Sequence, residues 1–374
     1  CLSLVLATIS AATLDKSFIL EKFMDSPKEL FKAYYTLFNK DAEYDINSPE
    51  GIKKYQVFKQ NVDWIKTENK KAGKQIYGIT QFVDLTHAEF VERHLMNPSK
   101  IEAEFNLKLD ITPSLSTPFS EKVEVDWRKK SNDAKNQASC GSCWSFAAMA
   151  AVEANYNIYF GEKLNLSEQY LVDCDDKDNG YNGGWPTSTF TWLKENGVLN
   201  NADRPYKAAR TLCGSNDKEK SQNIVAGFEY CEGNCKADYW LSLLKKGPLV
   251  VAMDASSENF GKYKPSSIDE PWVPMKCDKV NHAVTAVGVK VVEGKALLIV
   301  RNSWGSTWGF EGYFSVDADN ACGITNYAWL PVTQLHQPYP APVCPEIYSD
   351  CDLTKNKTLN ECQGIASAKN TIGG

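Results

Sequence analysis

The chain has 374 residues, more than one average domain, and its 43% hydrophobic and 24% charged residues are typical of a globular protein. Its formal net charge of -6 argues against nucleic-acid binding, which needs a basic surface, so no nucleic-acid partner is expected. No apolar stretch is long enough to cross a bilayer, so no membrane span is expected either.

The chain begins with an apolar segment, residues 2–12, that ends in small residues. This pattern is typical of the end of a signal peptide, so residues 1–12 are interpreted as a signal-peptide remnant, with a buried helix as the alternative. Twelve cysteines favour an oxidising compartment, and the sequons at Asn165 and Asn356 agree with glycosylation on a secretory route. We therefore expect the protein in the secretory pathway, either in a lysosome or vacuole or outside the cell.

Residues 13–96 lack cysteine and contain one strong helix pattern. Between residues 51 and 69, an apolar stripe at helical spacing comprises Ile52, Tyr55, Phe58, Val62 and Ile65. Residues 97–120 combine prolines with serine and threonine, which predicts a linker. The front of the chain is therefore expected to be a helical unit joined by a linker to the rest.

Residues 121–331 contain most of the tryptophans and form the expected main globular unit. A helix-like run begins at Cys143 and contains no proline or glycine before Gly161. Strands are predicted by the apolar runs at 249–252, 283–292, 296–300 and 313–316. Residues 332–374 are interpreted as a C-terminal extension, because they begin with a proline-rich segment and contain three further cysteines.

Cys143 is the candidate nucleophile of the main unit. A thiol at a helix N-terminus faces unpaired N–H groups and the positive end of the helix dipole, and both stabilise its thiolate. Such a nucleophile also needs a base, which is most often histidine. Of the four histidines, His87 and His94 precede the linker and His336 lies in the extension, so elimination pairs Cys143 with His282.

Asn302 is the candidate for the third catalytic group. It follows a predicted strand, and its amide oxygen can accept the ring N–H of His282 while Trp304 shields that bond from water. For either residue alone, a core histidine or a turn asparagine is the alternative. The pair Cys140 and Cys143 also allows a redox or zinc site, but a thioredoxin-like pair would have its tryptophan before the first cysteine, and no second histidine lies nearby.

The sequence Cys-Gly-Ser-Cys-Trp at residues 140–144, with a histidine and an asparagine far downstream, resembles papain and the cathepsins. The resemblance extends from Asp126 to Pro331. It implies an α+β papain-like two-lobe fold, in which a helical lobe carries Cys143 and a β-barrel lobe carries His282 and Asn302.

The resemblance also implies the role of each catalytic residue. Cys143 attacks the peptide carbonyl to form a thioester acyl-enzyme, His282 protonates the leaving amine, and Asn302 orients His282. Gln137 supplies a side-chain donor to the oxyanion hole. The family uses no metal and no organic cofactor, so none is expected here.

A substrate site is implied in the same way. Gly184 is expected to pair with the peptide backbone, which requires the absence of a side chain. The expected substrate-binding residues are Gly183, Gly184, Trp185, Pro186, Ala252, Val280, Ala283, Trp304 and Tyr327. No acidic residue is expected at the floor of the main pocket, and Tyr327 should shorten it, so Leu or Val is favoured over a basic or large side chain. Ordinary core packing of these residues is the alternative.

Residues 13–96 resemble the inhibitory propeptide of the cathepsin L-like branch. The matching positions are Glu50, Phe58, Asn61, Ile65, Asn69, Gly78, Phe82 and Asp84. Lys54 stands where arginine is usual, and Thr80 stands where asparagine is usual. The resemblance implies a mainly helical intramolecular inhibitor that runs through the active cleft in the reverse direction to substrate and is released by cleavage within 116–123. A solvated helix without inhibitory role is the alternative.

The cysteines follow the family pattern only in part. Two family disulfides are matched by Cys174 with Cys213 and by Cys277 with Cys322. The usual partner of Cys140 is replaced by Tyr181, so Cys140 is either free or paired elsewhere. Five cysteines without a counterpart are Cys231, Cys235, Cys344, Cys351 and Cys362, and their pairing stays open, including a link from the extension to Cys231 or Cys235.

The expected protein is thus a monomeric precursor of a cysteine endopeptidase that hydrolyses peptide and protein substrates in mildly acidic, reducing surroundings. Two alternatives remain. One is a catalytically silent homologue that acts as a binding or structural protein, although such homologues commonly lose the nucleophile, which is present here. The other is an exopeptidase of the same fold, although no histidine-bearing insertion is apparent that would bind a terminal carboxylate.

Overall fold

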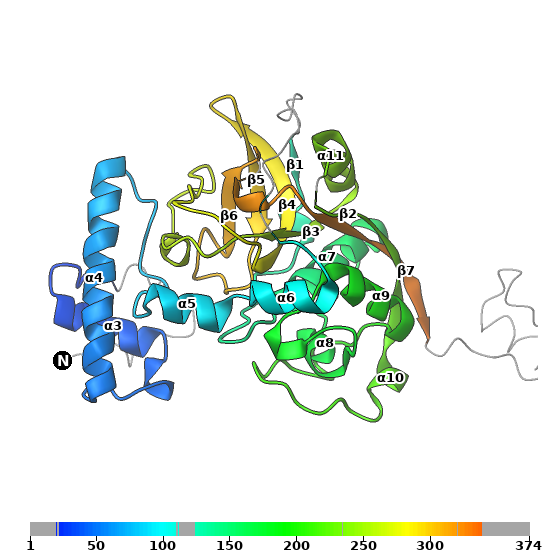
Figure 1. Cartoon of the computed structure of the whole chain (residues 1–374), viewed down its shortest axis with the longest axis horizontal. Helices are drawn as coiled ribbons and strands as arrows, with labels where there is room; N and C mark the ends of the chain where they lie inside the picture. Colours follow the sequence, from blue (N-terminus) through cyan, green and yellow to red (C-terminus); the bar gives the residue numbers. More distant parts are fainter. Residues whose placement is uncertain are drawn as a thin grey trace, which may run out of the picture.

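The computed structural model describes residues 20, 22–109, 111, 124–233, 235–319 and 321–338 (Figure 1). The expected signal-peptide remnant, the expected activation region and the cysteines of the extension lie outside these residues. The helices and strands are α3 (Pro27–Leu37), η1 (Lys40–Ala42), α4 (Pro49–Ala72), α5 (His87–His94), α6 (Pro98–Phe105), β1 (Val125–Asp126), η2 (Arg128–Lys130), α7 (Cys143–Phe160), α8 (Glu168–Cys174), η3 (Gly180–Asn182), α9 (Pro186–Asn196), α10 (Asp217–Lys220), β2 (Gln222–Cys231), α11 (Ala237–Lys246), β3 (Leu249–Met253), η4 (Phe260–Lys262), β4 (His282–Val292), β5 (Lys295–Arg301), β6 (Tyr313–Asp317), η5 (Ala321–Gly323) and β7 (Ala328–Pro338). Within the described part of the chain, no helix has the length and apolarity needed to cross a membrane.

The long helix α4 organises the front unit. Ser48 caps its N-terminus by accepting the Gly51 N–H at 3.0 Å, Pro49 occupies the first turn, and Gly73 ends the helix with φ of 65°. Three residues of the predicted apolar stripe are buried against α3, namely Phe58, Val62 and Ile65. Ile52 is instead 54% exposed, because at 100° per residue it lies about 120° around the helix from Phe58.

Polar residues of the expected propeptide motifs fasten α4 to the segment that follows it. The Asn61 side-chain amide donates to the Val83 carbonyl at 2.8 Å, and Asn69 Oδ1 accepts the backbone N–H of Tyr77 at 2.9 Å. The buried Asp84 carboxylate accepts the Tyr34 hydroxyl at 2.6 Å. The front unit is therefore held by buried hydrogen bonds as well as by its apolar core.

One antiparallel sheet lies at the centre of the main unit, with strand order β2-β7-β3-β4-β5-β6 and with β1 paired to β4. The four apolar runs that predicted strands correspond to β3, β4, β5 and β6. Because β4 and β5 are antiparallel, the start of β4 at His282 and the end of β5 at Arg301 lie at the same edge of the sheet. This topology brings His282 beside Asn302.

Two apolar cores give the main unit its two lobes. One core surrounds α7 and includes Cys143, Trp144 and Phe190, and the other lies on the sheet and includes Trp304 and Phe314. Helix α7 contacts β3, β4 and β7, so the helix that begins at Cys143 lies against the sheet that carries His282 (Figure 1). The expected α+β papain-like architecture with a mainly helical front unit is therefore present.

The segment predicted to be a linker begins instead with a helix, α6. Pro98 is one of the prolines that predicted the linker, but it occupies the first turn of α6, where proline favours a helix. Asn97 caps this helix by accepting the Lys100 N–H at 3.2 Å, and Asn106 ends it with φ of 52°. In Figure 1, α5 and α6 lead from the front unit across the main unit.

The main unit also extends beyond its expected end at residue 331. Strand β7 continues to Pro338, because its outer half pairs with β2, with Gln222 opposite Pro338. Sequence pattern did not reveal this half of the strand, since its pairing partner lies more than a hundred residues away.

Three disulfides are formed among the described residues. Cys174–Cys213 and Cys277–Cys322 are those expected from the family pattern. Cys231 pairs with Cys235, so the proposed link from the extension to either of these two cysteines is wrong.

Cys140 is a buried free thiol, and hydrogen bonds hold its loop in place of the usual disulfide. The Tyr181 hydroxyl donates to the Ser139 carbonyl at 2.5 Å, and the Gly141 N–H donates to the Tyr181 carbonyl at 3.1 Å. The residue that replaces the family cysteine therefore tethers the same loop.

Candidate active site

Cys143 is the first residue of α7 and is fully buried. Its Sγ accepts the backbone N–H of Ala283, the residue after His282, at 3.5 Å. Burial raises the pKa of the Cys143 thiol to about 12, although the N–H groups of Ala283 and Trp144 act in the opposite direction. Desolvation thus outweighs the lowering of the Cys143 pKa that was expected from the helix N-terminus.

His282 is fully buried and bonded to Asn302. Its Nε2 lies 2.9 Å from Asn302 Oδ1, which also accepts the Ser303 N–H at 2.8 Å. With Nε2 donating to this oxygen, Nδ1 carries the free lone pair, and Nδ1 has no hydrogen-bond partner among the described residues. The Trp304 ring stacks on the imidazole at 4.9 Å and covers the bond to Asn302.

Burial also changes the ionisation of the His282 imidazole. It lowers the pKa of His282 to about 4, although the bond to Asn302 acts in the opposite direction. The imidazole is therefore neutral over most of the pH range in which the Cys143 thiol is protonated. Thiol and imidazole are therefore both uncharged in this state.

Gln137 precedes the loop that leads into α7 and is held by three hydrogen bonds. Its Nε2 donates to the Cys140 carbonyl at 2.8 Å and to the His94 carbonyl at 3.1 Å. Its Oε1 accepts the Ser303 hydroxyl at 2.5 Å, so the amide cannot rotate freely. The sequence did not single out Ser303, although it directly follows Asn302. His94, which was excluded as a base because it precedes the linker, contributes its backbone carbonyl here.

Residues 96–109, which follow α5 and include α6, lie across the main unit beside Cys143 and His282. The Met96 N–H donates to the Asn281 carbonyl at 2.8 Å, and the Val280 N–H donates to the Leu109 carbonyl at 3.0 Å. Met96 and Leu109 also belong to the apolar core that contains Cys143. A substrate therefore cannot reach the thiol while this segment remains bound.

Aromatic rings of the front unit cover the other end of the site. Phe82 and Phe90 meet the Trp304 ring edge-on at 5.1 and 5.4 Å, and Gln81 Nε2 donates to the Trp304 carbonyl at 2.6 Å. His94 Nδ1 lies 3.0 Å from the Ala138 carbonyl. These contacts exclude water from the catalytic residues and explain their burial.

A short loop of the main unit anchors the front unit. Tyr77 forms an antiparallel bridge with Tyr263, and the Thr80 hydroxyl donates to the Gly261 carbonyl at 2.6 Å. Thr80, which replaces the usual asparagine, thus makes a buried contact of its own. Lys54, which replaces the usual arginine, pairs with Glu89 at 2.6 Å.

The expected pocket residues come together in one apolar core. Those that share it with Cys143 are Trp185, Ala252, Val280, Ala283 and Tyr327. Pro186 is buried beside them at the start of α9. The Tyr327 hydroxyl lies 3.4 Å from the Lys108 carbonyl of the front unit.

The two glycines of the expected substrate wall have different neighbours. A Cβ on Gly183 would lie 2.8 Å from the Ile101 side chain of the front unit, whereas a Cβ on Gly184 would lie 2.5 Å from the Trp144 ring. Gly184 is therefore required by packing against Trp144, and Gly183 is the glycine that faces the bound segment.

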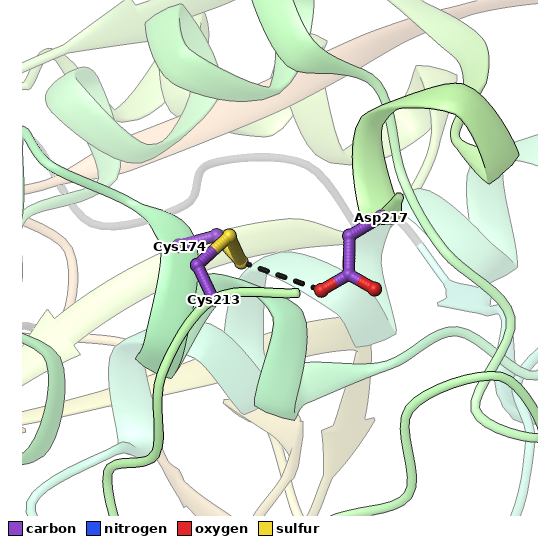
Figure 2. A group of neighbouring side chains, drawn as sticks. All are labelled: Cys174, Cys213 and Asp217. Atoms are coloured by element: carbon purple, nitrogen blue, oxygen red, sulfur yellow. Dashed lines mark hydrogen bonds between the residues drawn. A yellow bond between two sulfur atoms is a disulfide. The ribbon is translucent and has the colours of Figure 1, made fainter. Parts of the chain in front are cut away.

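Cys174, Cys213 and Asp217 place possible metal-ligand atoms close to one another. Asp217 Oδ2 lies 3.7 Å from Cys174 Sγ, which is bonded to Cys213 (Figure 2). Both sulfurs are oxidised in a disulfide and offer no thiolate, and Asp217 pairs with Arg204 at 2.5 Å. The cluster therefore has a structural role.

Comparisons with known proteins identify the family of the chain. A family model described as "Papain family cysteine protease" matches residues 122–332, and one described as "Cathepsin propeptide inhibitor domain (I29)" matches residues 31–90. Chymopapain from Carica papaya is 33% identical over 312 residues, covering 81% of this chain and 86% of the relative. Cysteine proteinase 3 from Entamoeba histolytica is 35% identical over 284 residues, covering 74% of this chain and 86% of the relative.

Solved precursor structures share the whole arrangement. Procathepsin L 3 from the larval midgut of Tenebrio molitor aligns with a TM-score of 0.67 at 27% identity, covering 82% of this chain and 99% of that one. A recombinant stem bromelain precursor aligns with a TM-score of 0.68 at 31% identity, covering 82% and 98%. The chain belongs to the papain family of cysteine proteases and is the precursor of an endopeptidase with a cathepsin-type inhibitory propeptide.

Proposed function

We propose that Cys143, His282, Asn302 and Gln137 are the catalytic residues of this endopeptidase. The observation that carries the proposal is the bond from His282 Nε2 to Asn302 Oδ1 at 2.9 Å, which leaves Nδ1 as the nitrogen able to take a proton. The bond from the Ala283 N–H to Cys143 Sγ at 3.5 Å supports the same pairing, since Ala283 is the neighbour of His282.

The reaction follows from these positions. Once the propeptide leaves, Nδ1 of His282 takes the thiol proton, and the thiolate attacks the peptide carbonyl carbon. Gln137 Nε2, which donates to the His94 carbonyl in the precursor, is then free to donate to the developing oxyanion. His282 returns the proton to the leaving amine as the C–N bond breaks, and water attacks the thioester with His282 as the base.

The precursor is proposed to be latent for two reasons that act together. Residues 94–109 occupy the cleft, and their burial of the catalytic pair keeps thiol and imidazole uncharged, with pKa values of about 12 and about 4. Removal of the propeptide restores water to both groups and allows the thiolate–imidazolium pair to form. We propose that cleavage within 116–123, outside the described residues, completes this release.

The main specificity pocket is proposed to bind a branched aliphatic side chain two residues before the cut. Trp185, Ala252, Val280 and Tyr327 give it an apolar lining, and the Tyr327 ring limits its depth. We further propose a monomer that acts on peptide and protein substrates. Disulfide-bearing papain-family proteases are typical of the secretory pathway, and we propose a lysosome or vacuole, or the exterior of the cell, as the compartment.

The test is acid activation of the full chain followed by labelling with an epoxide thiol probe and mass spectrometry. We expect one label, on Cys143, a mature N-terminus within 116–123, and cleavage of an internally quenched peptide that is blocked at both ends. The Cys143→Ala chain, given the same treatment, should neither label nor cleave. Labelling of Cys140 instead, or hydrolysis by the Cys143→Ala chain, would show that the nucleophile is misassigned.

A further inference from the structure

Three aromatic rings pack together behind the proposed pocket. Trp185 meets Tyr327 and Trp329 edge-on, with ring centroids 5.5 and 5.3 Å apart, and Tyr327 stacks on Trp329 at 5.9 Å. All three are at most 4% exposed. Because Trp185 and Tyr327 also line the pocket, the orientation of this aromatic triad (Trp185, Tyr327 and Trp329) sets the pocket's shape.

One carboxylate oxygen holds both indoles of the aromatic triad. Trp185 Nε1 donates to Glu232 Oε1 at 2.6 Å, and the Thr187 hydroxyl donates to the same oxygen at 2.8 Å. Thr187 in turn accepts the Nε1–H of Trp329 at 2.9 Å. A buried indole N–H needs an acceptor, and a charged acceptor binds it more strongly than a neutral one.

Glu232 lies on a turn that is fastened to the segment from Asn326 to Trp329, which carries the other two rings and leads into β7. The turn is closed by the Cys231–Cys235 disulfide. Cys231 pairs in the sheet with Ala328, which lies between Tyr327 and Trp329, and Cys235 Sγ lies 3.1 Å from the Asn326 carbonyl. These two cysteines are not part of the two disulfides that match the family pattern.

We propose that Glu232 is a positioning residue that determines specificity, fixing the Trp185 indole through the disulfide-closed turn and so preserving the apolar pocket. The inference rests on the proposed function, since the pocket is part of it. Without Glu232, the buried Nε1–H of Trp185 loses its acceptor, and the ring turns toward water to regain one. The pocket then loses its fit to a branched side chain, while Cys143 on α7, His282 on β4 and Asn302 just after β5 keep their positions.

The test compares mature Glu232→Ala, Glu232→Gln and wild-type enzymes on two peptides that differ only in Leu or Gly two residues before the cut. Epoxide titration of Cys143 counts active sites, so kcat and KM refer to folded enzyme alone. For Glu232→Ala we expect kcat/KM on the Leu peptide to fall about 10-fold, mainly through KM, and the Gly peptide to change less than about 2-fold. Glu232→Gln keeps an acceptor oxygen and should stay within about 3-fold of wild type.

Glu229→Ala is the matched control, because Glu229 lies on β2, shortly before the turn of Glu232, but pairs with Lys246 at 2.7 Å on an exposed surface. It should leave both peptides unchanged. If too little Glu232→Ala folds, Thr187→Val tests the same network, since it leaves the Trp329 Nε1–H without its acceptor and should reduce the Leu preference in the same direction.

Two outcomes would contradict the inference in different ways. If the wild type prefers Leu and Glu232→Ala retains that preference, or slows equally on both peptides, Glu232 does not position the pocket. If the wild type shows no preference for Leu, the proposed pocket itself is wrong and the inference falls with it.

Discussion

The ion pair between Lys54 and Glu89 joins α4 to the helix that leads into the active cleft. Lys54 Nζ lies 2.6 Å from Glu89 Oε1, and the two side chains are 6% and 29% exposed. Lys54→Met removes the charge but keeps the length of the side chain. Loss of one partner of a buried pair lowers the free energy of unfolding by about 3–5 kcal/mol. Because Glu89 is part-exposed and keeps its hydrogen bonds to Thr86, we expect Lys54→Met to lower it by about 2 kcal/mol.

The pH dependence of this loss follows from the carboxylate. Although burial acts in the opposite direction, hydrogen bonds from Lys54 and Thr86 lower the pKa of Glu89 from 4.5 to about 2. The stabilisation is therefore fully present above about pH 4.5 and is lost as the pH falls through about 2. Because the variant lacks this contribution, the difference in free energy of unfolding between variant and wild type should shrink as the pH falls through this range. The variant precursor should also self-activate at a higher pH than the wild-type precursor.

The assay is urea unfolding of the full chain, with Cys143→Ala in every protein to prevent self-cleavage. At pH 7 the midpoint of propeptide unfolding should fall by about 1–2 M. Lys71→Met is the matched control on the same helix, since Lys71 is 67% exposed and pairs with Glu68, and it should cost under about 0.5 kcal/mol. An unchanged midpoint for Lys54→Met, or a difference from wild type that does not depend on pH, would refute the reasoning.

Three further predictions concern the catalytic unit. Asn302→Ala removes the acceptor of the His282 Nε2 proton, so kcat of the mature enzyme should fall about 10²-fold with little change in KM. A rise in KM as large as the fall in kcat would argue against an orienting role for Asn302. At pH 7, iodoacetamide should modify Cys143 at least about 10²-fold more slowly in the precursor than in the mature enzyme, because burial keeps the thiol protonated; equal rates would show that the propeptide does not shield it. Tyr181→Phe removes the bond to the Ser139 carbonyl and should destabilise the mature enzyme by about 1 kcal/mol in thermal unfolding, whereas no change would mean that the hydroxyl does not replace the missing disulfide.

The fold could be predicted where a local pattern was strong. The apolar runs gave β3 to β6, because each run is continuous and buried, and α7 was expected from its helix formers between Cys143 and Gly161. The sequence did not predict the pairing of β2 with the outer half of β7. Buried and exposed side chains do not alternate regularly along β2, and its partner strand is distant in sequence. Helix α6 was missed because Pro98 was taken as a sign of a linker.

The site could be predicted where chemistry restricts the residue type. The pairing of Cys143 with His282 could be predicted by elimination among the four histidines, whereas the roles of Asn302 and Gln137 rested on the resemblance to papain and the cathepsins. Glu232 could not be found in this way, because a glutamate on a turn has no distinguishing pattern until the fold brings it to Trp185. The ionisation of Cys143 was also beyond the sequence, since it depends on burial by a segment that lies about forty residues earlier.

The pairing of β2 with the outer half of β7 lies far from the inhibitory segment. In Figure 1 this strand ends at the opposite end of the molecule from α3 and α4. Loss of the front unit during activation should therefore leave the pairing of β2 with the end of β7 intact, so the sheet of the mature enzyme keeps its edge.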